Sequence, residues 1–307
     1  MALLIKGGEI VTATDRYVAD IFCEDETVTR IGRGLQAPPG TDVIDASGKW
    51  VFPGFIDPHT HIHLPFMGTF AKDDYTSASQ AALIGGTTTI MEMICPGRED
   101  EPLGAFELWK GKAEGKSACD FTFHMGVTRY DAAAESQLKE IVRRGVASFK
   151  VFLAYKGALG IDDGELWRTL KLARSLGVIT TAHCENADAI AARQAELLAA
   201  GKSGPRFHHE SRPPLIEAEG VHHLLTFAAL HDAHVYIVHL SCEEALREAI
   251  AGKARGVQVW VETLIQFLLL DKSVGEREEC GEGAKYVMSP PLRDKANQRV
   301  LWEGLRS

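Results

Sequence analysis

From residue 50 onward, short apolar runs alternate with amphipathic stretches, and this rhythm restricts the possible folds more than any other feature of the sequence. Strands are predicted at 50–59, 87–93, 120–127, 148–155, 177–184, 234–241 and 258–265. Helices are predicted near 72–84, 101–115, 132–144, 163–176, 186–201, 214–231, 243–255 and 297–305. Strands that alternate with helices in this way are typical of a parallel α/β fold.

The predicted strands are apolar on both faces, as a parallel sheet covered by helices requires. An open doubly wound sheet is compatible with this pattern, but an eight-stranded (β/α)8 barrel fits the number of residues per unit better. Seven strands can be identified, and the chain ends in a predicted helix where an eighth strand should begin. We therefore predict a TIM-like (β/α)8 barrel of which seven strands are present.

Residues 3–50 have a different character. They are rich in β-type alternation interrupted by Gly and Pro turns, and no helix pattern occurs among them. A piece of two or three strands is only marginally stable by itself. We expect this region to pack against another part of the protein.

Composition excludes several functional classes. The 307 residues carry a net charge of −9, which argues against binding to nucleic acid. No apolar run approaches the roughly 20 residues that span a bilayer, and the apolar start of the chain is too short for a signal peptide. The six cysteines are scattered without a CxxC motif, as in reduced cytosolic proteins. We expect a cytoplasmic protein with neither nucleic-acid nor membrane partners.

Polar side chains are predicted at the ends of several strands, where (β/α) barrels carry their active sites. These residues are His59, His61, Lys150, His183 and His239. His59 and His61 lie two apart on an extended segment, so both imidazoles can reach one metal ion. A pair of solvent-facing loop histidines is the alternative, and a single core histidine is more often structural. The four histidines together favour a metal site.

Lys150 lies inside the apolar run Ser-Phe-Lys-Val-Phe-Leu. Burial disfavours a charged ammonium and lowers the pKa of a lysine, which makes the neutral amine available for chemistry. One outcome is reaction with carbon dioxide to give a carbamate that bridges two cations. The alternative is a lysine whose charged end reaches the rim of the barrel.

Other motifs carry little weight. Residues 32–37 match GxGxxA, but Pro38-Pro39-Gly40 follows instead of a helix, so the context of a dinucleotide site is missing. Neither GxxxxGK[ST] nor GxSxG occurs. The adjacent histidine pairs 208–209 and 222–223 are expected on the surface or in loops.

Longer motifs carry a family resemblance. They are GFIDPHTH (54–61), GGTTT (85–89), FKVFLAYK (149–156), TAHCEN (181–186), VHLSC (238–242) and SPPLRDKANQ (289–298). With them the chain closely resembles the hydantoinase/dihydropyrimidinase family of cyclic amidohydrolases. The resemblance implies a barrel at 51–307 and, at 1–50, the N-terminal part of a small flanking β-sandwich. It also implies two divalent metal ions, usually zinc, with manganese as a possibility.

Roles for individual residues follow from the resemblance. His59 and His61 would hold the more buried cation, His183 and His239 the second, and carbamylated Lys150 would bridge them. Tyr155 would donate a hydrogen bond to the developing oxyanion, and Ser289 would bind the ring amide mainly through its backbone. Three apolar residues beside the ligands are hypothesised to line the substrate pocket, with plain packing as the alternative: Leu64, Phe66 and Phe152.

The implied reaction opens a hydantoin or dihydropyrimidine ring to an N-carbamoyl amino acid. An allantoinase-like activity and a non-catalytic dihydropyrimidinase-like scaffold are the alternatives. Dihydroorotase-like relatives carry an Arg where this chain has His63, so they rank lower. The resemblance also implies a homotetramer with a small cyclic amide as its substrate.

One family residue is missing from the sequence. An Asp that ends the eighth strand, in a GTDH-like segment, ligates the buried metal and shuttles a proton to the leaving nitrogen. No such segment occurs here, and Asp271 and Asp294 stand in other contexts. The expectation is that this chain is a fragment or truncated form, with little or no turnover if the 307 residues are the entire protein.

Overall fold

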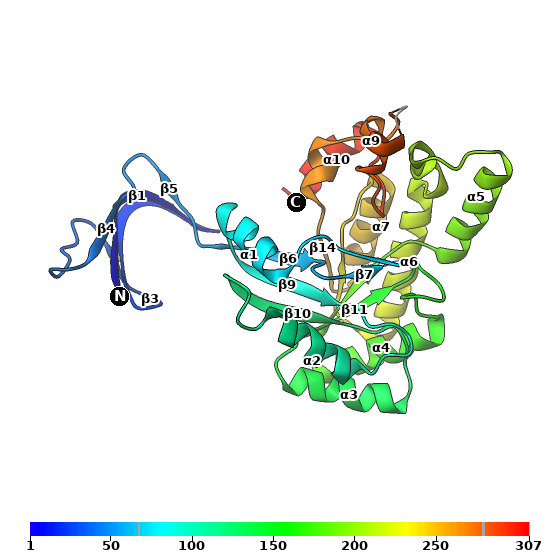
Figure 1. Ribbon diagram of the computed structural model, residues 1–307, viewed down its shortest axis with the longest axis horizontal. Helices are drawn as coiled ribbons and strands as arrows, with labels where there is room; N and C mark the ends of the chain where they lie inside the picture. Colours follow the sequence, from blue (N-terminus) through cyan, green and yellow to red (C-terminus); the bar gives the residue numbers. More distant parts are fainter. Residues whose placement is uncertain (67, 278–279, 307) are drawn as a thin grey trace.

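The computed structural model describes residues 1–66, 68–277 and 280–306. Its main sheet is parallel and takes its strands in chain order (Figure 1). The strands are β6 (Phe55–Thr60), β9 (Thr87–Ile94), β10 (Asp120–Gly126), β11 (Ser148–Phe152), β12 (Ile179–His183), β13 (Val235–Ile237) and β14 (Val259–Val261). Within the described residues β6 and β14 are the two edge strands. His59 of β6 nevertheless contacts Glu262, directly after β14, so the sheet curls until its two edges approach each other.

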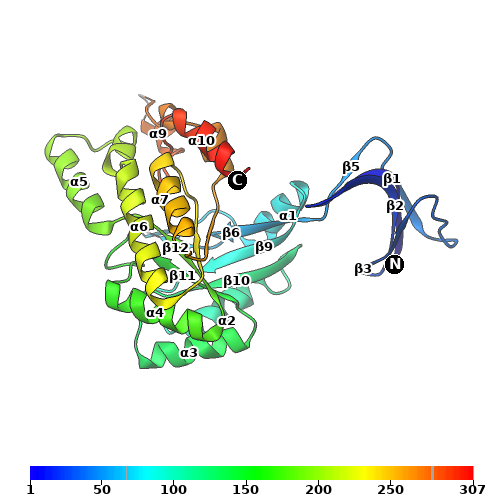
Figure 2. The same ribbon diagram turned by 180° about the vertical axis from the view of Figure 1, so that it is seen from behind.

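Helices follow the strands and cover the outside of the sheet. They are α1 (Tyr75–Ile84), α2 (Pro102–Ala113), α3 (Ala132–Arg143), α4 (Asp163–Leu176), α5 (Ala187–Ala199), α6 (Pro214–His231) and α7 (Glu243–Ala254). Figure 2 shows α4, α6 and α7 side by side, in agreement with their packing contacts. Strands that alternate with helices and a curled parallel sheet confirm the predicted incomplete barrel with seven strands among the described residues.

Local sequence explains where these helices begin. Asp74, Asp131, Asp162 and Asn186 each accept a backbone N–H of the first turn, which satisfies a donor that a helix leaves free. α4 ends at Gly177, whose left-handed φ of 68° suits a residue without Cβ. Leu166, Leu170 and Ala173, at helical spacing on one face of α4, are buried.

Shorter elements complete the chain between and after the main helices. They are β7 (Pro65–Phe66), β8 (Thr69–Phe70), the short 3₁₀ helices η1 (Pro205–Phe207), η2 (His209–Ser211) and η3 (Lys272–Val274), and the helices α8 (Ile265–Leu269), α9 (Cys280–Ala284) and α10 (Ala296–Gly304). None of the helices in the described part of the chain is long and apolar enough to cross a bilayer.

The N-terminal residues form a separate sheet at one end of the molecule (Figures 1 and 2). It contains β1 (Ala2–Val11), β2 (Arg16–Glu24), β3 (Thr27–Gly32), β4 (Asp42–Asp45) and β5 (Trp50–Val51). β1 pairs antiparallel with β2 and parallel with β4 and β5. Several apolar side chains of this sheet are exposed, among them Val18, Val28, Ile31, Val43 and Ile44. Its membership of a β-sandwich stays a prediction.

Most predicted strands were longer than the observed ones, and two of them ran into a different element. The run 50–59 divides between the two sheets, because Pro53 has no N–H to donate and the chain leaves one sheet to enter the other. At Gly54 a Cβ would lie 2.0 Å from the Oγ1 of Thr88, so this crossing needs glycine. The run 258–265 was also wrong at its end, since the strand stops at Val261 and Ile265 begins α8.

The histidine pairs 208–209 and 222–223 also have defined places. His222 and His223 lie on helix α6, where they form ion pairs at its outer side. His208 lies between the short 3₁₀ helices η1 and η2, and His209 is the first residue of η2. His208 is only partly exposed and contacts the chain near Ser289, which a surface assignment does not explain.

Candidate metal and substrate site

A cavity of about 340 Å³ opens at the carboxyl ends of the parallel strands. It is lined by residues from β6, β11 and β12 and from the segments that follow several of the strands: His59, His61, Leu64, Phe66, Phe152, Tyr155, Leu159, His183, His239, Leu264, Gln266, Met288 and Ser289. Nine of the ten residues predicted for the site are among them, and the tenth is Lys150. The cavity therefore joins residues that lie far apart in the sequence.

His59 and His61 converge at the end of β6. Their Nε2 atoms lie 3.2 Å apart. Two nitrogens bound tetrahedrally to one zinc ion at 2.0–2.1 Å would be separated by roughly 3.3 Å. The pair therefore has the spacing of two ligands of one cation.

Glu262 fixes the ring of His59 from behind. The Nδ1–H of His59 donates to Oε1 of Glu262, which leaves Nε2 as the nitrogen that faces His61. The same carboxylate oxygen accepts the backbone N–H of His239 at 3.1 Å. A carboxylate behind a histidine sets its tautomer and ring orientation in metal sites. Glu262 thus links the first and sixth strands of the barrel.

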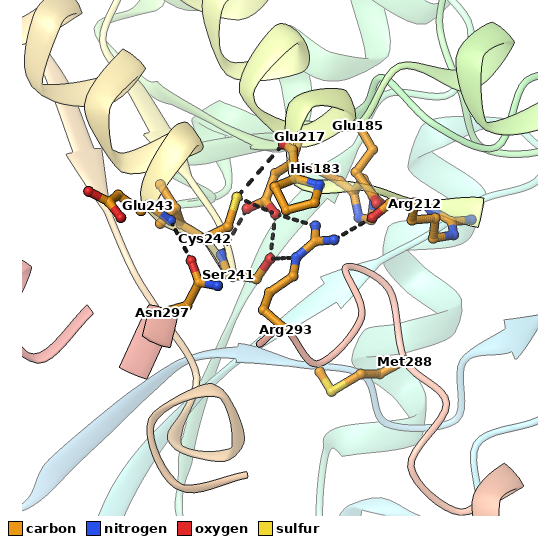
Figure 3. Close-up of polar contacts among 12 residues, drawn as sticks. His183, Glu185, Arg212, Glu217, Ser241, Cys242, Glu243, Met288, Arg293 and Asn297 are labelled. Atoms are coloured by element: carbon orange, nitrogen blue, oxygen red, sulfur yellow. Dashed lines mark hydrogen bonds and ion pairs between the residues drawn. The ribbon is translucent and has the colours of Figure 1, made fainter. Parts of the chain in front are cut away.

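His183 and His239 form the second pair. Their ring centroids lie 4.6 Å apart, and the ring of His239 lies 5.3 Å from that of His59. The Nε2–H of His183 donates to Glu185 at 2.8 Å, so Nδ1 remains for a ligand. Arg212 donates to the same Glu185 oxygen at 2.5 Å. This second pair also has a carboxylate behind one ring (Figure 3).

Lys150 is completely buried in the middle of β11, not at the end of its strand as the sequence suggested. Its Nζ has no hydrogen-bond partner within the described part of the chain. It lies 4.9 Å from the ring centroid of Phe152, and burial lowers its pKa to about 8. A buried ammonium without a partner is costly. The rim position that the alternative required is wrong.

The electrostatics of the four histidines favour neutral rings. Burial lowers the pKa of His59, His61 and His239 well below the ordinary value, and the nearby Lys150 charge adds to the effect on each. The pKa of His183 is also lowered by burial, although Glu185 opposes the shift. A neutral imidazole offers the lone pair that a metal ion needs.

The donor set fits cations only when Lys150 is included. Among the described residues, no three His, Cys, Asp or Glu side chains converge closely enough to hold a metal ion by themselves. The buried Nδ1 atoms of His61 and His239 and Nζ of Lys150 have no hydrogen-bond partners there. Two histidine pairs around one unpartnered lysine therefore fit two cations that share a ligand derived from the lysine.

Backbone strain also gathers at this site. His63, Tyr155 and His239 have positive φ values of 55°, 59° and 42°. Asp25 and Asp232 are the other described non-glycine residues with positive φ; because Asp and His adopt this conformation more readily than other side chains, Tyr155 is the most unusual of the five. Strained residues of this kind cluster at functional sites.

The aromatic wall contains Tyr155, Phe66 and Phe152. The ring of Tyr155 lies 5.1 Å from His183 and 5.3 Å from Phe66, so it stands between the second histidine pair and the apolar wall. Leu64, Phe66 and Phe152 line the cavity. Phe152 belongs to a small buried apolar cluster, and Leu64 and Phe66 pack against that cluster. Their hypothesised contact with substrate is untested.

Ser289 also lines the cavity, within hydrogen-bonding reach of Tyr155. The Nε2–H of His208 donates to the carbonyl oxygen of Met288 at 2.9 Å and lies 3.2 Å from Oγ of Ser289. These contacts come from a segment some 80 residues earlier in the chain. His208 therefore holds the backbone that carries Ser289.

Sequence reasoning missed the polar residues behind the ligands. Glu92 of β9 is fully buried and accepts the N–H of Ile62 at 2.9 Å and the hydroxyl of Thr60 at 2.8 Å. His124 of β10 donates from Nε2 to the carbonyl of Pro58 at 2.9 Å. The available signal was a charged or polar residue inside an apolar strand, as in Thr-Ile-Met-Glu-Met.

Comparisons with known proteins agree on one family. A model described as "Amidohydrolase family" matches residues 50–258. The D-hydantoinase of Geobacillus stearothermophilus is 44% identical, over 100% of this chain and 65% of that protein. The dihydropyrimidinase of Rattus norvegicus is 36% identical, over 95% of this chain and 57% of that protein.

A solved structure is similar over the same range. The D-hydantoinase (dihydropyrimidinase) from Thermus sp. superposes with a TM-score of 0.97 and 58% identity, covering 99% of this chain and 66% of that one. The chain thus spans somewhat less than two thirds of the length of these relatives.

Proposed function

The chain belongs to the amidohydrolase family, and from this premise we propose that its cavity binds two divalent cations and serves the hydrolysis of cyclic amides. The matches to D-hydantoinases and dihydropyrimidinases confirm the resemblance inferred from the motifs. The observation that carries the proposal is the placement of two histidine pairs around the unpartnered, buried Lys150. Because the relatives are longer, the activity of the whole protein is also a proposal.

His59 and His61 would hold one cation and His183 and His239 the other, with carbamylated Lys150 between them. Nitrogen ligands of this kind suit zinc, and manganese is the alternative. Burial lowers the pKa of Lys150, which favours the neutral amine that can react with carbon dioxide. Two bound cations would supply Lewis acidity and lower the pKa of a water molecule.

The substrate would be a hydantoin or dihydropyrimidine. Burial raises the pKa of Tyr155, so its hydroxyl keeps its proton and can donate to the oxygen that becomes negative during the reaction. Ser289 would bind the ring amide through its backbone, while Leu64, Phe66 and Phe152 contact the exocyclic group. Addition of water across the ring C–N bond would give an N-carbamoyl amino acid.

Proton transfer to the leaving nitrogen has no assigned residue in this chain. No Asp lines the cavity within the described residues. Asp271 instead caps η3, and Asp294 pairs with Lys272 at 2.9 Å. For this chain, the binding of metal and of cyclic amide is therefore predicted more directly than catalytic turnover. Turnover needs a base that is not among the residues that line the cavity.

We further propose a cytoplasmic homotetramer. Five of the six cysteines have described side chains, and all five are free thiols, which supports a reducing compartment. The side chain of Cys280 lies outside the described residues. The tetramer rests on the family resemblance alone. Light scattering on the purified protein would measure its mass.

The test incubates the zinc-loaded chain with 5-benzylhydantoin, dihydrouracil and allantoin, and measures binding by calorimetry and N-carbamoyl products by chromatography. The proposal predicts binding of the first two that disappears when the metal is removed. Preference for allantoin would favour the allantoinase-like alternative. A chain that takes up no metal and binds none of the three would support the non-catalytic scaffold.

A further inference from the structure

A buried arginine anchors the segment that carries Ser289. Arg293 lies in the segment 288–297, and only 4% of its side chain is exposed. Its Nε donates to Oγ of Ser241 at 2.8 Å, its Nη2 to Oε2 of Glu217 at 2.7 Å, and its Nη1 to the carbonyl oxygen of Arg212 (Figure 3). Because the guanidinium is a rigid planar fork, contacts on three sides fix its position and direction.

The acceptors of Arg293 belong to the barrel itself. Glu217 lies on α6 and is fully buried, and Ser241 follows β13. Oε1 of Glu217 accepts the backbone N–H of Ser241 at 2.8 Å, and Oε2 accepts the Ser241 hydroxyl. Arg293 therefore donates to two side chains, Glu217 and Ser241, whose positions are already fixed by their contacts with each other.

Weaker attachments hold the same segment on either side. Lys272 donates its backbone N–H to the carbonyl of Arg293 at 2.9 Å. Asn297 accepts the N–H of Glu243, at the start of α7, at 2.9 Å. The neighbouring Asp294 has 68% of its side chain exposed, so the charged anchor is Arg293 and not the residue beside it.

We infer that Arg293 is a positioning residue for substrate: its buried contacts with Ser241 and Glu217 hold segment 288–293 so that Ser289 faces the cavity. The inference rests on the proposed function. Arg293 contacts no proposed metal ligand directly; its nearest link is the carbonyl of Arg212, whose side chain donates to Glu185 behind His183. Removing Arg293 therefore weakens the binding of cyclic amide much more than the binding of cations.

The test uses variants that separate positioning from folding. R293M alone leaves the charge of Glu217 buried without its partner, which destabilises a protein strongly. R293M/E217Q removes that charge while the amide keeps an acceptor for Ser241, and R293K restores part of the contact. R299M is the matched control, since Arg299 pairs with Glu303 on the exposed side of α10.

For each variant, zinc content is measured by plasma mass spectrometry and 5-benzylhydantoin affinity by calorimetry. R293M/E217Q is expected to keep the zinc content of the wild type and to bind the hydantoin about 10-fold more weakly, the effect of losing roughly one hydrogen bond to the ligand. R293K should lie between them, and R299M should match the wild type.

Wild-type hydantoin affinity in R293M/E217Q would overturn the inference, and so would a parallel loss of zinc and hydantoin, which would mean general structural support. A wild-type chain that binds neither zinc nor hydantoin contradicts the proposed function and this inference with it. Normal wild-type binding with unchanged variants contradicts this inference alone.

Discussion

Glu92 gives the most quantitative prediction, because its burial sets the sign of a pH effect on stability and its raised pKa sets an approximate size. Its carboxyl is fully buried on β9, and burial raises its pKa from 4.5 to about 8. It accepts from the backbone N–H of Ile62 and the hydroxyl of Thr60, on either side of His61. Glu92 thus supports the segment that carries the first histidine pair.

A raised pKa in the folded state means that the folded protein binds this proton more tightly than the unfolded chain. The stabilisation is complete below about pH 4.5 and is lost as the pH rises through about 8. One proton contributes about 1.4 kcal/mol per pH unit, so the free energy of unfolding should fall by roughly 4–5 kcal/mol across this window from Glu92 alone.

The perturbation is E92Q, which keeps an acceptor for Ile62 but cannot ionise. Urea unfolding of metal-free wild type and E92Q between about pH 5 and pH 9 measures the difference, and other titrating groups cancel because both proteins share them. E92Q should gain on the wild type as the pH rises. E135Q is the control. Lys139 and Tyr130 lower the pKa of Glu135, so its effect on stability has the opposite sign and lies below about pH 4.5, and between about pH 5 and pH 9 the slope of E135Q should match that of the wild type.

Equal pH slopes for wild type and E92Q between about pH 5 and pH 8 would refute this reasoning. So would a stability difference that grows toward low pH. Either result would mean that Glu92 is solvated or paired in solution and does not hold the segment 60–62 as a buried neutral acid.

The remaining predictions concern the site. E262Q should weaken cation affinity about 10–100-fold in a chelator titration, because His59 and the backbone of His239 lose a charged acceptor. E248Q is the control, since Glu248 contacts the exposed His222 far from the site, and it should not change the affinity. Equal cation affinities of E262Q and the wild type would exclude the bridging role of Glu262. F152A should change the relative affinities for hydantoins with different exocyclic groups, and an unaltered profile would remove Phe152 from the pocket. Chelation of the metal should lower the melting temperature, and metal added back at 1,000 times its Kd should restore about 4 kcal/mol of stability. A melting temperature that does not change with metal would argue against a metal site in the folded protein.

Much of the fold was readable from the sequence because its signals are periodic. Apolar strands and amphipathic helices repeat seven times, and the His-x-His pair marks the end of a strand by the alternation of side chains. The break at Pro53 and Gly54 was missed because a proline inside an apolar run does not say which of two sheets each half joins. The close approach of Gly54 to Thr88, which requires glycine at this crossing, exists only in the folded chain.

The site was predictable for residues that belong to motifs and not for those behind them. His59, His61, His183 and His239 occur at strand ends, so position alone selected them. Glu262 and His124 act through contacts across 203 and 66 residues of sequence, which no local pattern encodes. Glu185 belongs to the TAHCEN motif and lies two residues from His183, but its role behind that ring was not assigned. For Lys150 the sequence left a buried amine and a rim position both open, and its burial without a partner became visible only from the surrounding side chains.

The central claim is that Lys150 joins two histidine pairs into one site for two cations. The direct measurement is the zinc content of the chain, loaded in the presence of bicarbonate, compared with that of K150M. The account predicts about two zinc ions per chain for the wild type, and one or fewer for K150M because the shared ligand is lost. Equal zinc content in both proteins, or none in the wild type, would contradict it.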